Sequence, residues 1–287
     1  MYKLFCDSNS EIWYTEVEAL GLNVISMPYV LDGEEYYYDL GKKTDFAHFY
    51  QRMREGAVPK TSAINEQNYI DYFEPVLKEG QDIFYVTFSH KLSATFESMD
   101  RAIASLKEKY PDRVIRTFDT KSISLGAGFQ VRLAAEKYNA GATMDELEAY
   151  LTEVRAHTVV YFVVDDLIYL KRGGRISALT AAFGKLLGIK PLITVKEDGS
   201  LESVGKIKGS KKVVSEFISL MHKHEADVKG HRIEILQADC PEAGDSLVAA
   251  LKGEFGDDIA IDYQIVGPVI ASHCGPGTLG IIFYGNK

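Results

Sequence analysis

Cysteine is scarce in this sequence, and its few copies lie far apart. The 287 residues include three cysteines, Cys6, Cys240 and Cys274, and no two of them have the spacing of a metal-binding pair. A sparse, odd set is typical of reduced thiols and not of a disulfide framework. We therefore expect a protein of the cytoplasm that holds no structural metal.

Long apolar runs and net positive charge are also missing. No apolar stretch approaches the ~20 residues of a membrane helix, and the amino terminus, MYKLFCDS, has the pattern of a strand rather than a signal peptide. The 41 acidic and 32 basic residues give a formal net charge of -9. Nucleic acids and anionic membranes attract basic faces. The composition therefore predicts no nucleic-acid partner and no transmembrane segment.

Common enzyme motifs are absent as well. The sequence contains no GxxxxGK[ST] phosphate loop and no HExxH motif, and Ser93 lies in KLSAT rather than in GxSxG. A hydrolase or acyltransferase with Ser93 as nucleophile and His273 as base remains an alternative hypothesis. Its orienting acid would be Asp7 or Asp119, and the sequence does not choose between them.

The stretch over residues 82–98 organises the first half of the chain. Residues 83–88 form a continuous apolar run, as in a parallel strand that is buried on both faces. A polar turn follows, and we predict that Ser93 is the N-cap of a helix reaching about Tyr110. Further strands are expected over residues 2–6, 23–31 and 114–118, with helices between them. This alternation predicts a parallel α/β sheet.

The second half has a different pattern. Residues 189–195 and 201–208 are typical of a hairpin, and other strands are expected over residues 158–164, 232–238, 259–266 and 280–283. Hairpins mixed with helices favour an α+β domain with a mixed or antiparallel sheet. We expect an N-terminal α/β domain over residues 1–158, a C-terminal α+β domain over residues 159–287, and a ligand in the cleft between them.

Several predicted turns carry side chains suited to an anion. They are Asp7-Ser8, Thr61-Ser62, Ser89 with Ser93, Asp119-Thr120, the basic turn Lys171–Arg175, and His273. The exits of parallel strands meet at one edge of a sheet, where ligands bind. Singly, such residues are more often caps, turn formers or solvated side chains. Together they fit the head group of one small anion, a carboxylate or a phosphate.

Seven short motifs follow one another in a distinctive order. They are CDS (6–8), PKTS (59–62), SHKLSATFES (89–98), DTKSISLGAG (119–128), YLKRGGRIS (169–177), IKPLI (189–193) and HCGPGTLG (273–280). In this order they resemble the DegV family, the fatty-acid-binding proteins also called FakB, over nearly the whole chain.

The resemblance implies two domains that hold one long-chain fatty acid between them, with no other cofactor. Its carboxylate would be bound by Thr61, Ser62 and Ser93, with Arg175 and His273 supporting the head group. The surrounding residues with a supporting role would be Asp7, Ser8, Ser89, Ala94, Thr95, Gly173, Gly174 and Gly275. A binding protein for another small amphipathic anion is the remaining alternative.

The family also implies a partner, a separate DAK-like fatty acid kinase that uses ATP to convert the bound acid into an acyl-phosphate. The chain would then present a substrate without catalysis of its own, which agrees with its missing nucleotide motif. The sequence departs from the family at Ala94, where glycine is usual, and at residues 63–65, where the family reads QPS. It also has Lys206 and Lys208 where arginine is common. The apolar run over residues 176–187 is expected to line the acyl tunnel.

Overall fold

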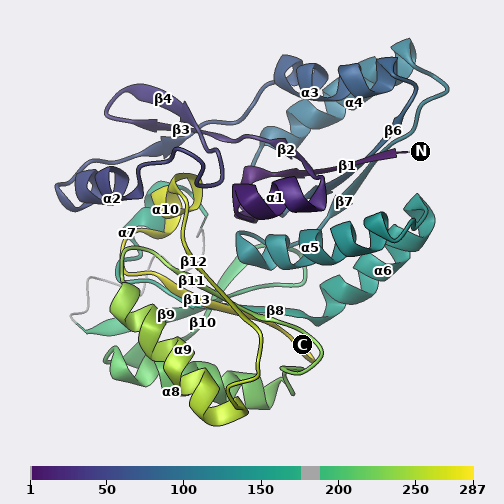
Figure 1. The fold of residues 1–287 in the computed structure, drawn as a ribbon. Helices are drawn as coiled ribbons and strands as arrows, with labels where there is room; N and C mark the ends of the chain where they lie inside the picture. The colour runs from purple at the N-terminus through teal and green to yellow at the C-terminus, as the bar shows by residue number, and fades with distance from the viewer. Residues whose placement is uncertain (1, 176–187) are drawn as a thin grey trace.

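The computed structural model describes residues 2–175 and 188–287. These residues form a four-stranded parallel sheet, a six-stranded mixed sheet and a small three-stranded antiparallel sheet (Figure 1). The parallel sheet comes from the first half of the chain and the mixed sheet from the second half. This is the α/β architecture that the sequence predicts, whereas the domain boundary at residue 158 stays a prediction. The expected tunnel wall at residues 176–187 lies outside the described residues.

The parallel sheet is covered on both faces. Its strands, in spatial order, are β2 (Asn23–Ile25), β1 (Tyr2–Asp7), β6 (Asp82–Thr87) and β7 (Ile115–Asp119). Helices α3 (Glu66–Lys78) and α4 (Thr95–Lys109) pack on one face, and α1 (Tyr14–Leu20), α5 (Leu125–Asn139) and α6 (Met144–His157) lie on the other (Figure 1). Two covered faces explain why β6 is a continuous apolar run.

The mixed sheet is covered outside by helices of the second half. Its order is β10 (Leu201–Lys208), β9 (Ile189–Val195), β8 (Thr158–Val163), β13 (Leu279–Tyr284), β11 (Ile233–Gln237) and β12 (Ile261–Ile265). Helices α8 (Lys211–Lys223) and α9 (Pro241–Phe255) pack against its outer apolar side. Helix α5 contacts β8, β11 and β13, so it lies between the two large sheets (Figure 1).

Glycines let α5 approach its neighbours. A Cβ on Gly126 would lie 2.8 Å from Val160 Cγ2 in β8, and a Cβ on Gly128 would lie 2.3 Å from the carbonyl oxygen of Ser10. Ser10 ends η1 (Ser8–Ser10), a short 3-10 helix that follows β1 directly. The close contact places this turn beside the space between the sheets.

The predicted strand over residues 23–31 is two strands. Its first part, β2, joins the parallel sheet, and β3 (Pro28–Leu31) pairs with β4 (Glu34–Tyr37) and β5 (Lys60–Thr61) in the small sheet. At the junction, the Ser26 N–H is bonded to Tyr72 Oη at 3.2 Å and the Met27 N–H to Ser8 Oγ at 2.8 Å. These side-chain acceptors replace a strand partner, so the ladder is interrupted. Helix α2 (Phe46–Arg54) accompanies the small sheet (Figure 1).

Three local predictions near the cleft are wrong. Ser93 is not the N-cap, because α4 begins at Thr95 with Ala94 as its cap, although Ser93 Oγ still accepts the Thr95 N–H at 3.2 Å. Thr61 lies in the short strand β5 and not in a loop. His273 lies in the last turn of α10 (Pro268–Cys274), where the sequence predicts a turn between elements. Helix α10 begins at Pro268, and proline is favoured at the first position of a helix.

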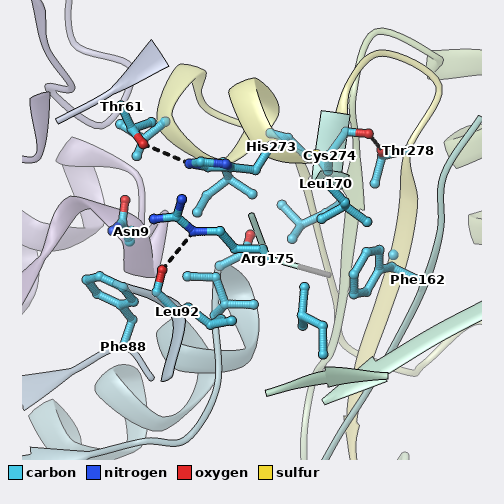
Figure 2. A pocket seen from close by; sticks show the side chains of 18 of the residues that line it. Asn9, Thr61, Phe88, Leu92, Phe162, Leu170, Arg175, His273, Cys274 and Thr278 are labelled. Carbon is cyan, nitrogen blue, oxygen red and sulfur yellow. Dashed lines mark hydrogen bonds between the residues drawn. The ribbon is translucent and has the colours of Figure 1, made fainter. Parts of the chain in front are cut away.

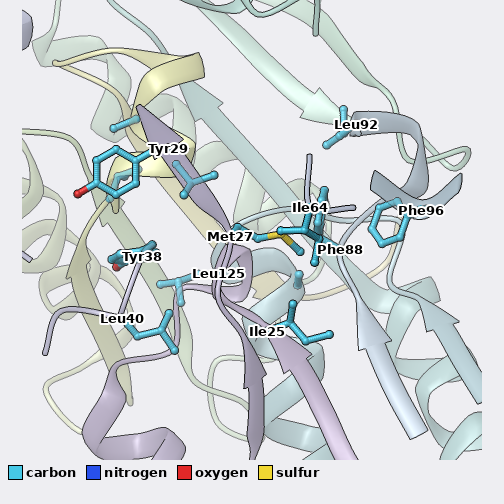
Figure 3. Close-up of a cluster of buried hydrophobic side chains, with 14 of the residues drawn as sticks. Ile25, Met27, Tyr29, Tyr38, Leu40, Ile64, Phe88, Leu92, Phe96 and Leu125 are labelled. Atoms are coloured by element: carbon cyan, nitrogen blue, oxygen red, sulfur yellow. The ribbon is translucent and has the colours of Figure 1, made fainter. Parts of the chain in front are cut away.

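Two further short elements border the cleft. They are η2 (His90–Leu92), which follows β6, and α7 (Ile168–Arg172), which carries the first part of the basic turn. A large apolar cluster joins the first half of the chain to α10, and Figure 3 shows one part of it around Met27, Ile64 and Phe88. Among the described residues, no helix combines the length and the apolar character needed to cross a membrane.

Candidate binding site between the two sheets

A narrow cavity lies between the two large sheets. Its apolar wall includes Phe162, Leu170, Leu236, Val266, Val269 and Ile282, which come from β8, α7, β11, α10 with the residues before it, and β13. Many side chains line it, yet its volume is only about 110 Å³. A cavity with many lining residues and a small volume fits a slender chain of methylenes better than a ring system.

One end of this cavity is polar. Thr61, Ser62, Ser93, Arg175 and His273, the five residues expected to bind a head group, all line it. Figure 2 shows Thr61, Arg175 and His273 close together, with Leu170 and Phe162 farther along the cavity. The structure therefore brings together residues that are more than 200 positions apart in the sequence, as Thr61 and His273 are.

Thr61 and His273 are joined by a hydrogen bond. Thr61 Oγ1 lies 2.8 Å from His273 Nε2, and His273 Nδ1 is buried with no partner among the described residues. Burial, followed by the nearby Arg175 charge, lowers the pKa of His273 to about 4, so the imidazole is neutral at pH 7. A proton on Nε2 lets the imidazole donate to Thr61. The Thr61 hydroxyl then keeps its own hydrogen to donate to a ligand.

The Arg175 guanidinium is fixed by backbone carbonyls. Its Nε donates to the Leu92 oxygen at 2.9 Å, and Nη1 donates to the Gly173 oxygen. Burial lowers the pKa of Arg175, yet a guanidinium remains charged throughout the physiological range. The cavity thus has a permanent positive charge at its polar end.

Within the part of the chain that the structure describes, no histidine is hydrogen-bonded to Ser93. The described histidines near it are engaged elsewhere, His273 Nε2 with Thr61 Oγ1 and His90 Nε2 with Thr87 Oγ1 at 2.9 Å. Ser93 Oγ accepts the Thr95 N–H at 3.2 Å. A serine nucleophile needs a hydrogen-bonded base, so this arrangement does not favour the hydrolase hypothesis. Thr95 also lines the cavity, but its hydroxyl is bonded to Tyr69 and Ile64.

Asp7 and Ser8 organise the turn after β1. Asp7 accepts hydrogen bonds from the Asn9 N–H at 3.0 Å and from Tyr85 Oη at 3.0 Å. Burial raises the pKa of Asp7 to about 7, and these bonds offset part of the rise. Ser8 Oγ accepts the Met27 N–H at 2.8 Å. Neither residue lines the cavity, so both act through the backbone that they hold.

Ser89 and the glycines also support the site from outside. Ser89 Oγ donates to the Gly199 oxygen at 2.8 Å and thereby joins the exit of β6 to the β9–β10 hairpin. A Cβ on Gly173 would lie 2.1 Å from His273 Nδ1, so only glycine fits beside this ring. A Cβ on Gly275, which has a φ of +77°, would lie 2.3 Å from the Tyr169 ring. Ala94 and Gly174 lie at an adjoining hollow.

That hollow continues from the polar end of the cavity. It measures about 670 Å³, is lined in part by Lys91, Lys196 and Glu97, and shares Ser93 and Arg175 with the cavity. A group held at Ser93 is therefore reachable from the hollow. Within residues 2–175 and 188–287, no three histidine, cysteine, aspartate or glutamate side chains are grouped to hold a metal ion.

Two buried residues of the site were not predicted, Asn9 and Glu11. Asn9 lines the cavity. Glu11 accepts hydrogen bonds from Ser124 Oγ at 2.8 Å and from the Gly267 N–H at 2.7 Å, which ties the turn after β1 to the start of α10. Burial raises the pKa of Glu11 to about 8. The polar run DSNSE, which begins at the last residue of β1, is the available signal.

Comparison with known proteins identifies the family of the chain. A family model described as "Uncharacterised protein, DegV family" matches residues 1–286. A DegV domain-containing protein of Clostridium perfringens is 36% identical over 286 residues, which are 99% of this chain and 98% of that protein. A DegV domain-containing protein of Streptococcus pyogenes is 31% identical and is covered to 99%.

Solved structures are similar over their whole length. A DegV family protein from Thermus thermophilus, described by its fatty acid binding, has a TM-score of 0.86 and 30% identity, with 99% of both chains covered. DegV of Bacillus subtilis, described as a fatty acid binding protein, has a TM-score of 0.84 and 25% identity, again with 99% of both chains covered. The chain described here belongs to the DegV family.

Proposed function

We propose that this protein binds one long-chain fatty acid, with its carboxylate at the polar end of the cavity and its acyl chain along the apolar wall. The observation that carries the proposal is the narrow apolar cavity that ends at the Thr61–His273 pair, Ser93 and Arg175. The fatty-acid binding described for the related Thermus thermophilus and Bacillus subtilis proteins supports it.

The polar end offsets the cost of burying a carboxylate. An unpaired charge in an apolar site costs several kcal/mol, so it requires donors or an opposite charge. In the proposed complex the hydroxyls of Thr61, Ser62 and Ser93 donate to the carboxylate, and Arg175 supplies the positive charge. Each buried methylene adds roughly 0.8 kcal/mol, so a long chain gains most of its affinity from the apolar wall.

We further propose that the bound acid is presented to a separate kinase of the cytoplasm. The hollow beside Ser93 leaves a carboxylate oxygen reachable, and Lys91 and Lys196 give it positive charges that suit a nucleotide phosphate. The carboxylate oxygen would attack the terminal phosphate of ATP, giving an acyl-phosphate and ADP. The described residues 2–175 and 188–287 supply no nucleotide loop of their own, which favours a partner enzyme.

The test is a titration of lipid-free protein with hexadecanoic acid and with its methyl ester. The ester keeps the chain but loses the negative charge, so the wild type should bind the acid more tightly. Thr61→Val and Ser93→Ala should each weaken acid binding about tenfold, because a hydrogen bond to a charged group contributes ~1.5–3 kcal/mol. Both variants should change ester binding much less. Lipid extracted from the purified wild type should contain a fatty acid.

Ser105→Ala is the matched control, because its exposed hydroxyl on α4 bonds Glu66 far from the cavity. It should bind both ligands like the wild type. Wild-type protein that carries no lipid and ignores fatty acids of every length would overturn the proposal. Binding of a different amphipathic anion in their place would support the remaining alternative. A kinase that phosphorylates the acid equally well without this chain would overturn the presentation step alone.

A further inference from the structure

Asn9 is a buried polar residue held rigidly on the cavity wall. It is the middle residue of η1, whose three residues are all buried, and its side chain is 5% exposed. Its N–H donates to Asp7 Oδ1 at 3.0 Å, while Ser8 beside it is fastened through Met27. The turn cannot swing outward without breaking these bonds, so the Asn9 carboxamide stays beside the cavity.

The Asn9 oxygen has no partner among residues 2–175 and 188–287. Asn9 Oδ1 is buried and accepts no hydrogen bond from any of these residues. Figure 2 shows the carboxamide at the polar end, near Arg175 and below Thr61. A buried acceptor without a donor costs roughly 1–3 kcal/mol. A fatty acid carboxylate is itself an acceptor when ionised, so a plain fatty acid gives this oxygen no donor.

We propose that Asn9 selects acyl ligands that carry a hydroxyl group near the carboxyl end, on the second or third carbon. The inference rests on the proposed function, since it requires the carboxylate at the polar end. A ligand hydroxyl donates to Asn9 Oδ1 and can accept from the carboxamide nitrogen, so both sides of the carboxamide are used. A site with a buried polar group discriminates strongly against a ligand that leaves the group unpaired.

The hydroxyl position follows from the placement of Asn9. Thr61, Arg175 and His273 surround the same end of the cavity (Figure 2), whereas Leu170 and Phe162 surround the chain farther along. A hydroxyl on the second or third carbon stays beside the head group. A hydroxyl at the far end of the chain lies against the apolar wall and loses its hydration there.

The experiment compares four ligands on lipid-free, full-length protein. They are hexadecanoic acid and its 2-hydroxy, 3-hydroxy and 16-hydroxy derivatives. The wild type should bind the 2-hydroxy or the 3-hydroxy acid about tenfold more tightly than hexadecanoic acid, and should bind the 16-hydroxy acid more weakly. Asn9→Leu keeps the approximate side-chain volume without polar atoms. It should remove the preference for the hydroxylated acids.

Ser10→Ala is the matched control, because Ser10 is buried in the same turn but does not line the cavity. It should keep the preference. The inference is overturned by equal binding of the hydroxylated and plain acids to the wild type, or by a preference that survives in Asn9→Leu. The wild-type series decides even if Asn9→Leu does not fold. If the wild type binds none of the four acids, the proposed function itself is contradicted. The failure of the inference and the failure of the proposed function are therefore distinguishable.

Discussion

The alpha carbon of Gly173 packs directly against the imidazole of His273. A Cβ at this position would lie 2.1 Å from Nδ1, far inside van der Waals contact. We expect Gly173→Ala to push the ring away and break its bond to Thr61. Thr61 would then no longer be held in position to donate to the carboxylate. Hexadecanoic acid binding should weaken about tenfold, which corresponds to the loss of that one hydrogen bond to a charged group. Isothermal titration calorimetry measures it.

Gly174→Ala separates this contact from backbone strain. Gly174 has a φ of +70°, and no atom of residues 2–175 or 188–287 lies within 4 Å of its added Cβ. Alanine there should cost roughly 1 kcal/mol of stability because of the left-handed backbone, with little change in affinity. Equal losses of affinity in both variants would show that strain in the turn, and not the His273 contact, controls the site.

The sequence predicts the members of the candidate site better than their surroundings. Thr61, Ser93 and His273 stand in motifs, and the structure gathers them at one cavity, while their binding roles remain proposals. Asn9 and Glu11 were not predicted, because a polar run after a strand reads as an exposed turn. Their burial depends on the close approach of α5 at Gly128, a tertiary contact that no local pattern indicates.

The β9–β10 hairpin closes over the exit of β6. Its tip residue Gly199 has a φ of +87°, accepts a hydrogen bond from Ser89, and would place a Cβ 2.2 Å from Ser89 Oγ. We expect Gly199→Ala to lift this tip. Because Leu201 of the same hairpin lines the cavity, a bound fatty acid should dissociate roughly tenfold faster, the effect of about 1.4 kcal/mol. Stopped-flow displacement measures this rate.

Gly209→Ala is a control at the other end of the same hairpin. Gly209 has a φ of +89°, and none of the described residues lies within 4 Å of its added Cβ. The backbone strain is therefore similar, but no contact with the first half of the chain is disturbed. An equal increase in dissociation rate for both variants would contradict a specific role of the Ser89–Gly199 contact.

Element types are predicted where the apolar pattern is long. Residues 83–88 predict β6 as a buried parallel strand because both faces of its sheet are covered, and the structure has this strand at Asp82–Thr87. The prediction from sequence is less successful for short elements. The seven-residue α10 contains His273 but reads as a loop, since its glycines and Pro276 follow closely. A helix of two turns owes its stability to packing, which local propensity does not contain.

The two large sheets are fastened together through α5. Arg132 of this helix donates to Glu16 of α1 at 2.8 Å, to Glu234 of β11 at 2.7 Å and to Asp262 of β12 at 2.6 Å. The alternation of elements predicts a parallel sheet followed by a mixed one. It does not predict this bridge, because an isolated arginine on a helix gives no indication of its partners across the molecule.

Removing the Arg132 charge should lower the free energy of unfolding of the protein. Its side chain is 4% exposed and that of Glu234 is 0% exposed, so Arg132→Met removes the cation from a buried group of acidic side chains. Breaking a buried pair in this way costs ~3–5 kcal/mol. Arg116→Met is the control, because Arg116 also has two acidic partners, Asp145 and Glu148, but at the surface. Exposed pairs contribute ~0–1 kcal/mol.

The stability that Arg132→Met loses should also depend on pH. Burial raises the pKa of Glu234 to about 8 even though Arg132 opposes the rise. A carboxyl group whose pKa is higher in the folded state favours folding less as pH increases from about 4.5 toward that pKa. Without Arg132 the folded pKa rises further, so the decline becomes larger. Urea unfolding should show a smaller loss of unfolding free energy for Arg132→Met at pH 5 than at pH 8. Equal losses at the two pH values would contradict the bridge through Arg132. Losses no larger than those of Arg116→Met would contradict it as well.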